Sequence, residues 1–390
     1  MRLDEEEIIA YLERIPDPRE RRGVRYRFSH LLLMAVYAIL AGCSEAMGME
    51  YYAELNAGYF RELLGLKTVP SHDTFSRMMQ MVDFQELGSN IAEWIRDCFP
   101  EICRRVAGYK VLHVDGKATR AAASKSDGGQ PVYNMNAMYE GEAISLNLMR
   151  VGDKENEISV LPRYLSLFDL RNTVVTIDAI GCNSTVIGTI TGKGGRYLVP
   201  VKENQPRLLE VIRGHVEELE RNGRLGKLPS AERTVKEHGR IETMRMTMVK
   251  DTGFIYEELG LASFFGSIAR VGVIDKKTVR KENGEEKTSR QRSYVVTNLE
   301  RVSVENMLAI KLSHWNVEAQ HWILDVQLNE DRSTARKGNA AASSAVLRRF
   351  CVLLRKYCPD FETKPLNRFL MANMHDIKRI EKLLFINTQK

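Results

Sequence analysis

The order of secondary-structure elements predicted after residue 105 is the feature that most constrains the fold of this chain. Alternating or β-branched runs are typical of strands, and apolar residues three and four apart are typical of helices. By these patterns three strands come first, and a helix, a strand, a second helix and a fifth strand follow. The predicted strands cover Lys110–Val114, Val132–Tyr139, Ala143–Val151, Thr173–Ile180 and Tyr197–Val201, and the predicted helices cover Ser159–Phe168 and Ser184–Thr191. This alternation indicates a mixed sheet with helices packed on it.

Two further regions flank and interrupt this segment. Residues 1–100 show helical patterns without a β-rich stretch, and residues 205–300 contain predicted strands around a hairpin turn at Glu282–Glu285. Three antiparallel strands followed by αβαβ is the layout of the ribonuclease-H-like fold. We therefore predict an α/β protein with four parts. They are an all-α N-terminal domain at 1–105, a ribonuclease-H-like catalytic core at 106–204 and 301–345, a β-rich insertion at 205–300, and a C-terminal basic helical segment at 346–390.

The N-terminal region predicts helices with recognisable ends. Leu31–Ala41 is apolar on nearly every side, so we expect a helix that is buried all round. Met49–Leu64 predicts one helix, and Gly65 should end it because glycine readily adopts a left-handed backbone. Ser71 predicts the N-cap of a helix that runs through Val82, since its hydroxyl can accept a hydrogen bond from a backbone N–H of the first turn.

The composition excludes several classes of protein. Of the 390 residues, 44% are hydrophobic and 28% are charged, a balance typical of globular proteins. The longest apolar run, Leu31–Cys43, is shorter than the ~20 residues that span a bilayer. We expect a cytoplasmic protein without a signal peptide or a membrane partner. The six cysteines form no Cys-x-x-Cys pair, which argues against a structural zinc site and favours reduced thiols.

Two aspartates occupy informative positions in the predicted sheet. Asp115 follows the first strand, and Asp178 lies near the end of the fourth. These strands are neighbours in a ribonuclease-H-like sheet, so both carboxylates should project from the same end. Converging carboxylates provide the hard oxygen ligands that Mg²⁺ prefers, and paired ions of this kind support phosphoryl transfer. The alternative is that each aspartate merely caps a strand or begins a turn.

A third carboxylate is expected on the predicted helix Val304–Val326. Glu318 lies four residues after His314 and three before His321, so the three side chains share one face of a helix. Asp325 lies seven residues beyond Glu318, on nearly the same stripe. The spacing lacks the His-Glu-x-x-His form of a zinc site. A surface helix with incidental charges is the alternative interpretation.

Basic residues gather in two places, although the net charge of the chain is only +6. Residues 1–100 carry a net charge of −5, yet six arginines crowd the segment 14–27. Residues 301–390 carry a net charge of +6, and Ala340–Tyr357 predicts a basic amphipathic helix. Such patches either bind phosphate backbones or form solvated faces. The second cluster comprises Arg332, Arg336, Lys337, Arg348, Arg349, Arg355 and Lys356.

Seven short stretches, in order along the chain, give it a specific resemblance. Each is a weak match alone, but together they extend over most of the sequence. The chain resembles the DDE insertion-sequence transposases of the H-repeat-associated (ISAs-type) group. The matching stretches are Ile15 to Cys43, Val114–Lys117, Lys154–Ile158, Thr176–Cys182, Lys202–Gln205, His238–Glu242, and His314–Glu318 followed by Leu324–Val326 and Asn329–Arg332.

This resemblance implies a catalytic triad and a reaction. Asp115, Asp178 and Glu318 would be the catalytic residues and the ligands of Mg²⁺, for which Mn²⁺ could substitute. They would cleave transposon-end DNA and join the 3′-hydroxyl to target DNA. In the wider superfamily the glutamate helix carries a Tyr/Arg/Glu/Lys signature. Here Lys311, His314 and Asp325 occupy its Tyr, Arg and Lys positions.

The same resemblance implies the partners. We expect DNA, both transposon ends and target, as the substrate, a homodimer or larger assembly on it, and association with the bacterial nucleoid. The alternatives are a host-domesticated ribonuclease-H-like nuclease and a catalytically silent DNA-binding protein. The predicted DNA-contacting residues are Lys117, Lys202, His314, His321, Arg332, Arg336 and Lys337.

Overall fold

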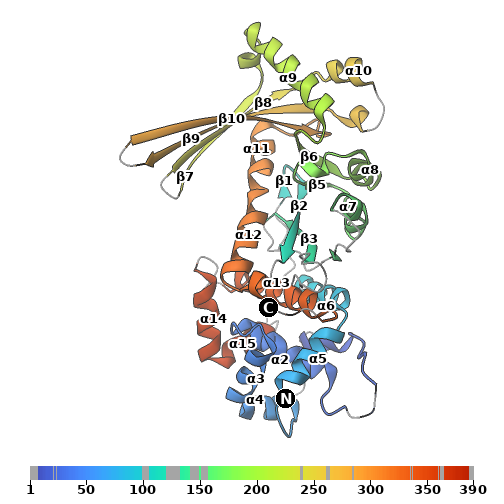
Figure 1. Cartoon of the computed structure of the whole chain (residues 1–390), viewed down its shortest axis with the longest axis vertical. Helices are drawn as coiled ribbons and strands as arrows, with labels where there is room; N and C mark the ends of the chain where they lie inside the picture. The colour runs from blue at the N-terminus through green and yellow to red at the C-terminus, as the bar shows by residue number, and fades with distance from the viewer. Residues whose placement is uncertain are drawn as a thin grey trace. The chain divides into compact units, whose positions relative to one another are not determined.

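The computed structural model divides the chain into two compact units (Figure 1). One, here called the helical unit, comprises residues 1–103, 116–154 and 318–390, and the other, the sheet unit, comprises residues 104–115 and 155–317. No helix among the residues described is long and apolar enough to cross a membrane. The structure describes residues 8–20, 22, 24–98, 105–119, 132–140, 149–150, 157–237, 240–260, 264–282, 285–333, 335, 337–358, 360 and 364–385.

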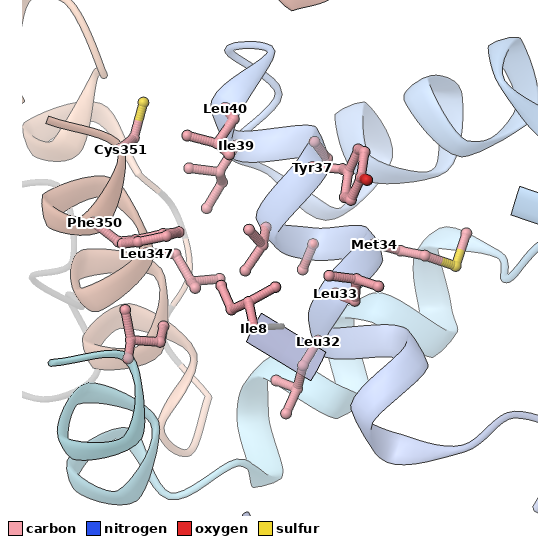
Figure 2. Close-up of a cluster of buried hydrophobic side chains, with 14 of the residues drawn as sticks. Ile8, Leu32, Leu33, Met34, Tyr37, Ile39, Leu40, Leu347, Phe350 and Cys351 are labelled. Carbon is pink, nitrogen blue, oxygen red and sulfur yellow. The ribbon is translucent and has the colours of Figure 1, made fainter. Parts of the chain in front are cut away.

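The helical unit is built around one buried helix, α2 (Phe28–Leu40). Every residue of α2 except His30 is buried, as its uniformly apolar sequence predicts. Figure 2 shows side chains of α2 facing Leu347 and Phe350, which come from the opposite end of the chain. The surrounding helices are α1 (Ile8–Glu13), α3 (Ala46–Leu55), α4 (Ala57–Leu64), α5 (His72–Met81), α6 (Phe84–Cys98), α13 (Ala340–Lys356), α14 (Leu366–His375) and α15 (Ile377–Leu384).

The predicted helix ends in this unit are partly correct. Gly65 ends α4 with a left-handed backbone, as predicted. Ser71 occupies the N-cap position of α5 as predicted, but its hydroxyl lies 3.3 Å from the Thr74 hydroxyl and caps no backbone N–H, and the helix ends at Met81. The single helix predicted over Met49–Leu64 is wrong, because α3 and α4 are separated at Asn56. The Asn56 side-chain amide donates a hydrogen bond to the Tyr52 carbonyl oxygen at 3.0 Å, which competes with the regular helical pattern.

The sheet unit contains a mixed sheet that changes from parallel to antiparallel pairing. β2 (Tyr109–Thr119), β5 (Thr173–Thr176) and β6 (Arg196–Val201) are parallel neighbours, and the short β1 (Arg105–Val106) pairs with β2. The next strand is antiparallel to β6 and begins an antiparallel ladder. The ladder consists of β10 (Glu285–Thr297), β9 (Arg270–Glu282), β8 (Arg240–Val249) and β7 (Ser230–Glu237).

Helices pack on this sheet, and the contacts between helix and sheet form the core of the sheet unit. The helix α11 (Val304–Ser313) packs against β6, β7 and β8, where Met307 and Ile310 meet Met246 and Ile274. The remaining helices are α7 (Glu157–Ser166), α8 (Ser184–Gly192), α9 (Pro206–Arg221) and α10 (Gly253–Leu259). The observed order of strands and helices from β2 to β6 is the order that the sequence predicts.

Two strands of the predicted hairpin lie in the helical unit. β3 (Val132–Tyr139) and β4 (Met149–Arg150) are antiparallel, and β3 neighbours β2, whose residues 116–119 belong to the same unit. The prediction that the first strand ends at Val114 is wrong, because β2 continues through Asp115 to Thr119. The domain boundaries predicted from the sequence stay predictions.

Two other sequence predictions need correction. The single helix predicted over Val304–Val326 is observed as α11 and α12 (Trp315–Val326), with His314 between them at helical backbone angles. The strand β7 was not predicted, because Ser230–Glu237 carries few apolar residues. It forms through its antiparallel pairing with β8, and pairing of this kind leaves little trace in the sequence of one strand.

Two arginines of α13 are buried, which overturns their predicted role in a solvent-facing basic cluster. Arg348 and Arg349 are 1% and 0% exposed. The Arg349 guanidinium forms an ion pair with Glu330 at 2.7 Å and donates two hydrogen bonds to the Asn136 side-chain oxygen, at 3.1 and 2.7 Å. The Arg348 guanidinium bonds to Glu45 at 2.9 Å. These side chains are committed to internal partners and do not present charge to DNA.

Candidate active site

The parallel pairing of β2 with β5 places the two predicted aspartates in equivalent positions. His113 is the register partner of Thr176, and Asp115 and Asp178 each lie two residues further along. Side chains two residues apart on a strand point to the same face. Asp115 is half-buried and Asp178 is exposed. The strand predicted over Thr173–Ile180 ends at Thr176, so Asp178 lies just beyond β5. The register places the two aspartates at the same level along neighbouring strands, and the convergence of their carboxylates stays a prediction.

The turn after β5 fixes the Asp178 carboxylate. Its Oδ1 accepts a hydrogen bond from the Ile180 N–H at 3.1 Å and caps a short 3₁₀ helix, Ala179–Gly181. Gly181 is required there, because an added Cβ would lie 2.6 Å from the Ile177 Cβ. This cap restricts the orientation of the carboxylate before any ligand arrives.

A second segment, Lys202 to Gln205, holds the same turn from the end of β6. The Asn204 side-chain amide donates to the Ala179 carbonyl at 2.6 Å, and the Gln205 amide donates to the Cys182 carbonyl at 2.9 Å. The resemblance had marked this stretch without giving it a role. Its amides brace the loop that follows Asp178.

The Cys182 thiol next to this turn takes no part in the candidate chemistry. Burial raises the pKa of the Cys182 thiol to about 12, so the thiol stays protonated near neutral pH. A protonated thiol is a poor metal ligand and a poor nucleophile. The Cys182 thiol is therefore a poor candidate ligand at this site.

A buried chain of hydrogen bonds lies beside the aspartates. Thr176 Oγ1 is 2.6 Å from His113 Nδ1 and 2.8 Å from His314 Nδ1, and the two imidazole rings meet edge to face at 5.7 Å. A hydroxyl has one proton, so Thr176 donates a hydrogen bond to at most one of these rings and must accept one from the N–H of the other. The chain ties β2 and β5 to the residue that follows α11.

This chain was not predicted from the sequence. Thr176 carries no local signal, and the pairing of His314 with Thr176 joins residues 138 positions apart. A weak signal was available in the spacing, because His113 and Thr176 each precede a predicted catalytic aspartate by two residues. His314, predicted to contact DNA, is half-buried and has its Nδ1 engaged by Thr176.

The other predicted site residues are less closely defined. Lys202 is exposed at the end of β6, Arg332 and Lys337 are exposed, and His321 is half-buried. The side chains of Lys117 and Glu318, and all of Arg336, lie outside what the structure describes. Within the described part of the chain, no three His, Cys, Asp or Glu residues gather closely enough to hold a metal ion.

Comparison with known proteins identifies the family. Residues 107–354 match the family described as Transposase DDE domain, a match that covers more than half of the chain. The chain belongs to the DDE transposase family. Residues 9–95 also match the family described as DDE_Tnp_1-associated. The resemblance read from the short motifs is thereby confirmed.

Three relatives illustrate the extent of the similarity. The H repeat-associated putative transposase YhhI of Escherichia coli K12 is 26% identical over 90% of both chains. The putative transposase YncI of Escherichia coli O157:H7 is 26% identical over 91% of this chain and 88% of its own. An uncharacterized protein from the dhlA 3′ region of Xanthobacter autotrophicus is 32% identical over 60% of this chain and 78% of its own.

Proposed function

We propose that this DDE transposase cleaves transposon-end DNA and transfers the freed 3′-hydroxyl to target DNA, using Asp115, Asp178 and Glu318 as its carboxylate triad. The observation that carries the proposal is the β2–β5 register, which supports a shared face for Asp115 and Asp178. Glu318, the third carboxylate of the proposed triad, lies four residues after His314, which is about one helical turn.

The strand order supports a ribonuclease-H-like core for this reaction. The sheet reads β4-β3-β2-β5-β6, with parallel pairing from β2 through β6. Numbered along the chain, this is the order 3-2-1-4-5 that the predicted fold requires. We infer that the first and fourth of these strands present the first two carboxylates of the triad.

The donor set fits Mg²⁺, because carboxylate oxygens are the ligands that this hard cation prefers. When bound, Mg²⁺ would supply activation of the nucleophile and stabilisation of the leaving oxygen. The chain itself positions the ligand groups. The hydrogen bond from the Ile180 N–H orients the Asp178 carboxylate, and the Asn204 and Gln205 amides hold the turn that follows it.

The proposed chemistry has two steps. In the first, water attacks a phosphorus atom at the transposon end, and the P–O3′ bond breaks to leave a 3′-hydroxyl and a 5′-phosphate. In the second, that 3′-hydroxyl loses its proton and attacks a target phosphodiester, so that one P–O bond forms as another breaks. Because both steps are phosphoryl transfers, positioning and charge stabilisation supply most of the catalysis.

Single conservative substitutions test the triad. Asp115→Asn, Asp178→Asn and Glu318→Gln should each abolish nicking of a labelled transposon-end duplex in Mg²⁺ or Mn²⁺, while binding of that duplex persists. Asp169→Asn is the matched control, because Asp169 is an exposed carboxylate paired with Arg171 away from the triad. If any of the three variants cuts at the wild-type rate, its assignment is wrong.

The products separate transposition from the two alternatives. Joined end–target molecules support strand transfer, hydrolysed ends alone would indicate a nuclease, and binding without cutting would indicate a silent DNA-binding protein. We also propose that the protein works as a dimer or larger assembly on paired ends. Sedimentation with and without end DNA measures that assembly.

A further inference from the structure

The antiparallel ladder β7–β10 carries an unbalanced row of charge on one face. Lys277 on β9 is the register partner of Arg290 on β10, and both side chains are exposed. The same transverse row continues through Thr243 on β8 and Thr234 on β7, so it contains no carboxylate. Like charges directly opposite each other destabilise a sheet unless another group compensates them.

The next row toward the tip adds another cation to this face. It runs from Lys236 through Ile241 and Val279 to Thr288, and again it contains no acid. Within the part of the chain that the structure describes, no carboxylate forms an ion pair with Lys236, Lys277 or Arg290. We call the surface formed by these two rows the basic face. Figure 1 shows the strands that carry it running out beyond α9.

Several cations next to the basic face form ion pairs with carboxylates. In the adjoining row Arg292 bonds to Asp275 at 2.7 Å and to Glu220 at 2.8 Å. On the opposite face Glu242 accepts ion pairs from Arg240 at 3.1 Å and Lys276 at 3.0 Å. These three cations have carboxylate partners, and the cations of the basic face are exposed.

We propose that the basic face of the β7–β10 ladder binds the phosphate backbone of duplex DNA. This inference rests on the proposed function, which requires DNA as the substrate. The exposed lysines and arginine supply the charge, and threonine hydroxyls supply hydrogen-bond donors to phosphate oxygens. Thr234 and Thr243 are hydrogen-bonded to each other at 3.0 Å, so one of these two hydroxyls can donate to phosphate, together with that of Thr288. Contacts of this kind with the phosphate backbone position DNA without reading its sequence.

The salt dependence of DNA binding tests the proposal. The variant Lys236→Gln/Lys277→Gln/Arg290→Gln is compared with the wild type, as full chains, by fluorescence anisotropy of a labelled duplex in EDTA. Each phosphate contact contributes about −0.9 to the slope of log affinity against log salt concentration. The slope of the variant should therefore be shallower by about 2 to 3.

A matched variant controls for the loss of three charges. Arg221→Gln/Arg224→Gln/Lys227→Gln changes the net charge by the same amount at exposed positions near the end of α9. This control should keep the wild-type slope. Because all six side chains are exposed, both variants should retain the wild-type circular dichroism spectrum.

The remaining outcomes overturn the proposal in distinguishable ways. If the basic-face variant keeps the wild-type slope, or if the slope of the control variant falls by as much, the basic face is not the DNA contact. In either case the proposed function stands. If the wild type binds no duplex at all, the basic face and the transposase activity both fail.

Discussion

Replacing Thr176 by valine should destabilise the sheet unit by about 2 to 4 kcal/mol. Valine keeps the β-branched shape that suits a strand, so the substitution removes little except the hydroxyl. That hydroxyl bonds to His113 at 2.6 Å and to His314 at 2.8 Å, and Thr176 is only 2% exposed. The perturbation is therefore the loss of one buried and one partly buried hydrogen bond at nearly constant volume.

The size of the expected stability loss follows from the hydrogen bond that each imidazole loses. A typical hydrogen bond contributes about 0.5 to 1.5 kcal/mol net, and a polar atom left buried without a partner costs about 1 to 3 kcal/mol. His113 is fully buried, so its Nδ1 bears the larger cost. His314 is only half-buried, and water can replace its lost partner at lower cost.

Urea denaturation followed by circular dichroism measures the effect. Thr173→Val is the matched control, because Thr173 is fully buried on the same strand and donates only long hydrogen bonds, at 3.2 and 3.5 Å. Thr176→Ser should retain most of the stability, since it keeps the hydroxyl. The reasoning is refuted if Thr176→Val shifts the unfolding midpoint no more than Thr173→Val does.

Two further predictions concern other buried groups. Arg349→Met should destabilise the helical unit by about 3 to 5 kcal/mol, because it removes the Arg349 guanidinium from the Glu330 carboxylate, which is 2% exposed. Thermal unfolding measures this, and a loss no larger than that of the exposed-residue variant Arg368→Met would contradict it. Burial raises the pKa of the Cys182 and Cys351 thiols to about 12, so the folded state keeps protons that the unfolded state loses. Stability should therefore fall as pH rises from about 9 toward 12, and Cys182→Ala/Cys351→Ala should show a smaller fall in alkaline denaturation curves.

The strands that lead to Asp115 and Asp178 could be predicted because their signals are local. Each aspartate follows a β-branched or apolar run, and the two runs form parallel neighbouring strands. The same kind of signal predicted α2, since a uniformly apolar helix has no solvent-facing side. Where the composition of a run of residues indicates how that run is buried, the predicted and observed structures agree.

The errors in the prediction arise where the burial or the partners of a residue depend on a segment that is distant in the sequence. The basic spacing in α13 indicated a charged face, but it could not show that Glu330, Asn136 and Glu45 would cover Arg348 and Arg349. The Thr176–His314 contact was missed for the same reason. The extension of β2 beyond Val114 was also missed, because small and charged residues do not signal a strand by themselves.

The core around α2 has a consequence for synthesis of the protein on the ribosome. Phe350 and Leu347, which pack with α2, are made about 300 residues after it, and translation proceeds at roughly 5–20 residues per second. About 15 to 60 seconds therefore pass between the synthesis of α2 and the synthesis of these partners. During that interval the first helices are exposed to chaperones and to neighbouring nascent chains. A chain stopped before α13 would leave that surface uncovered, so truncated products should aggregate or be degraded rather than accumulate as folded fragments.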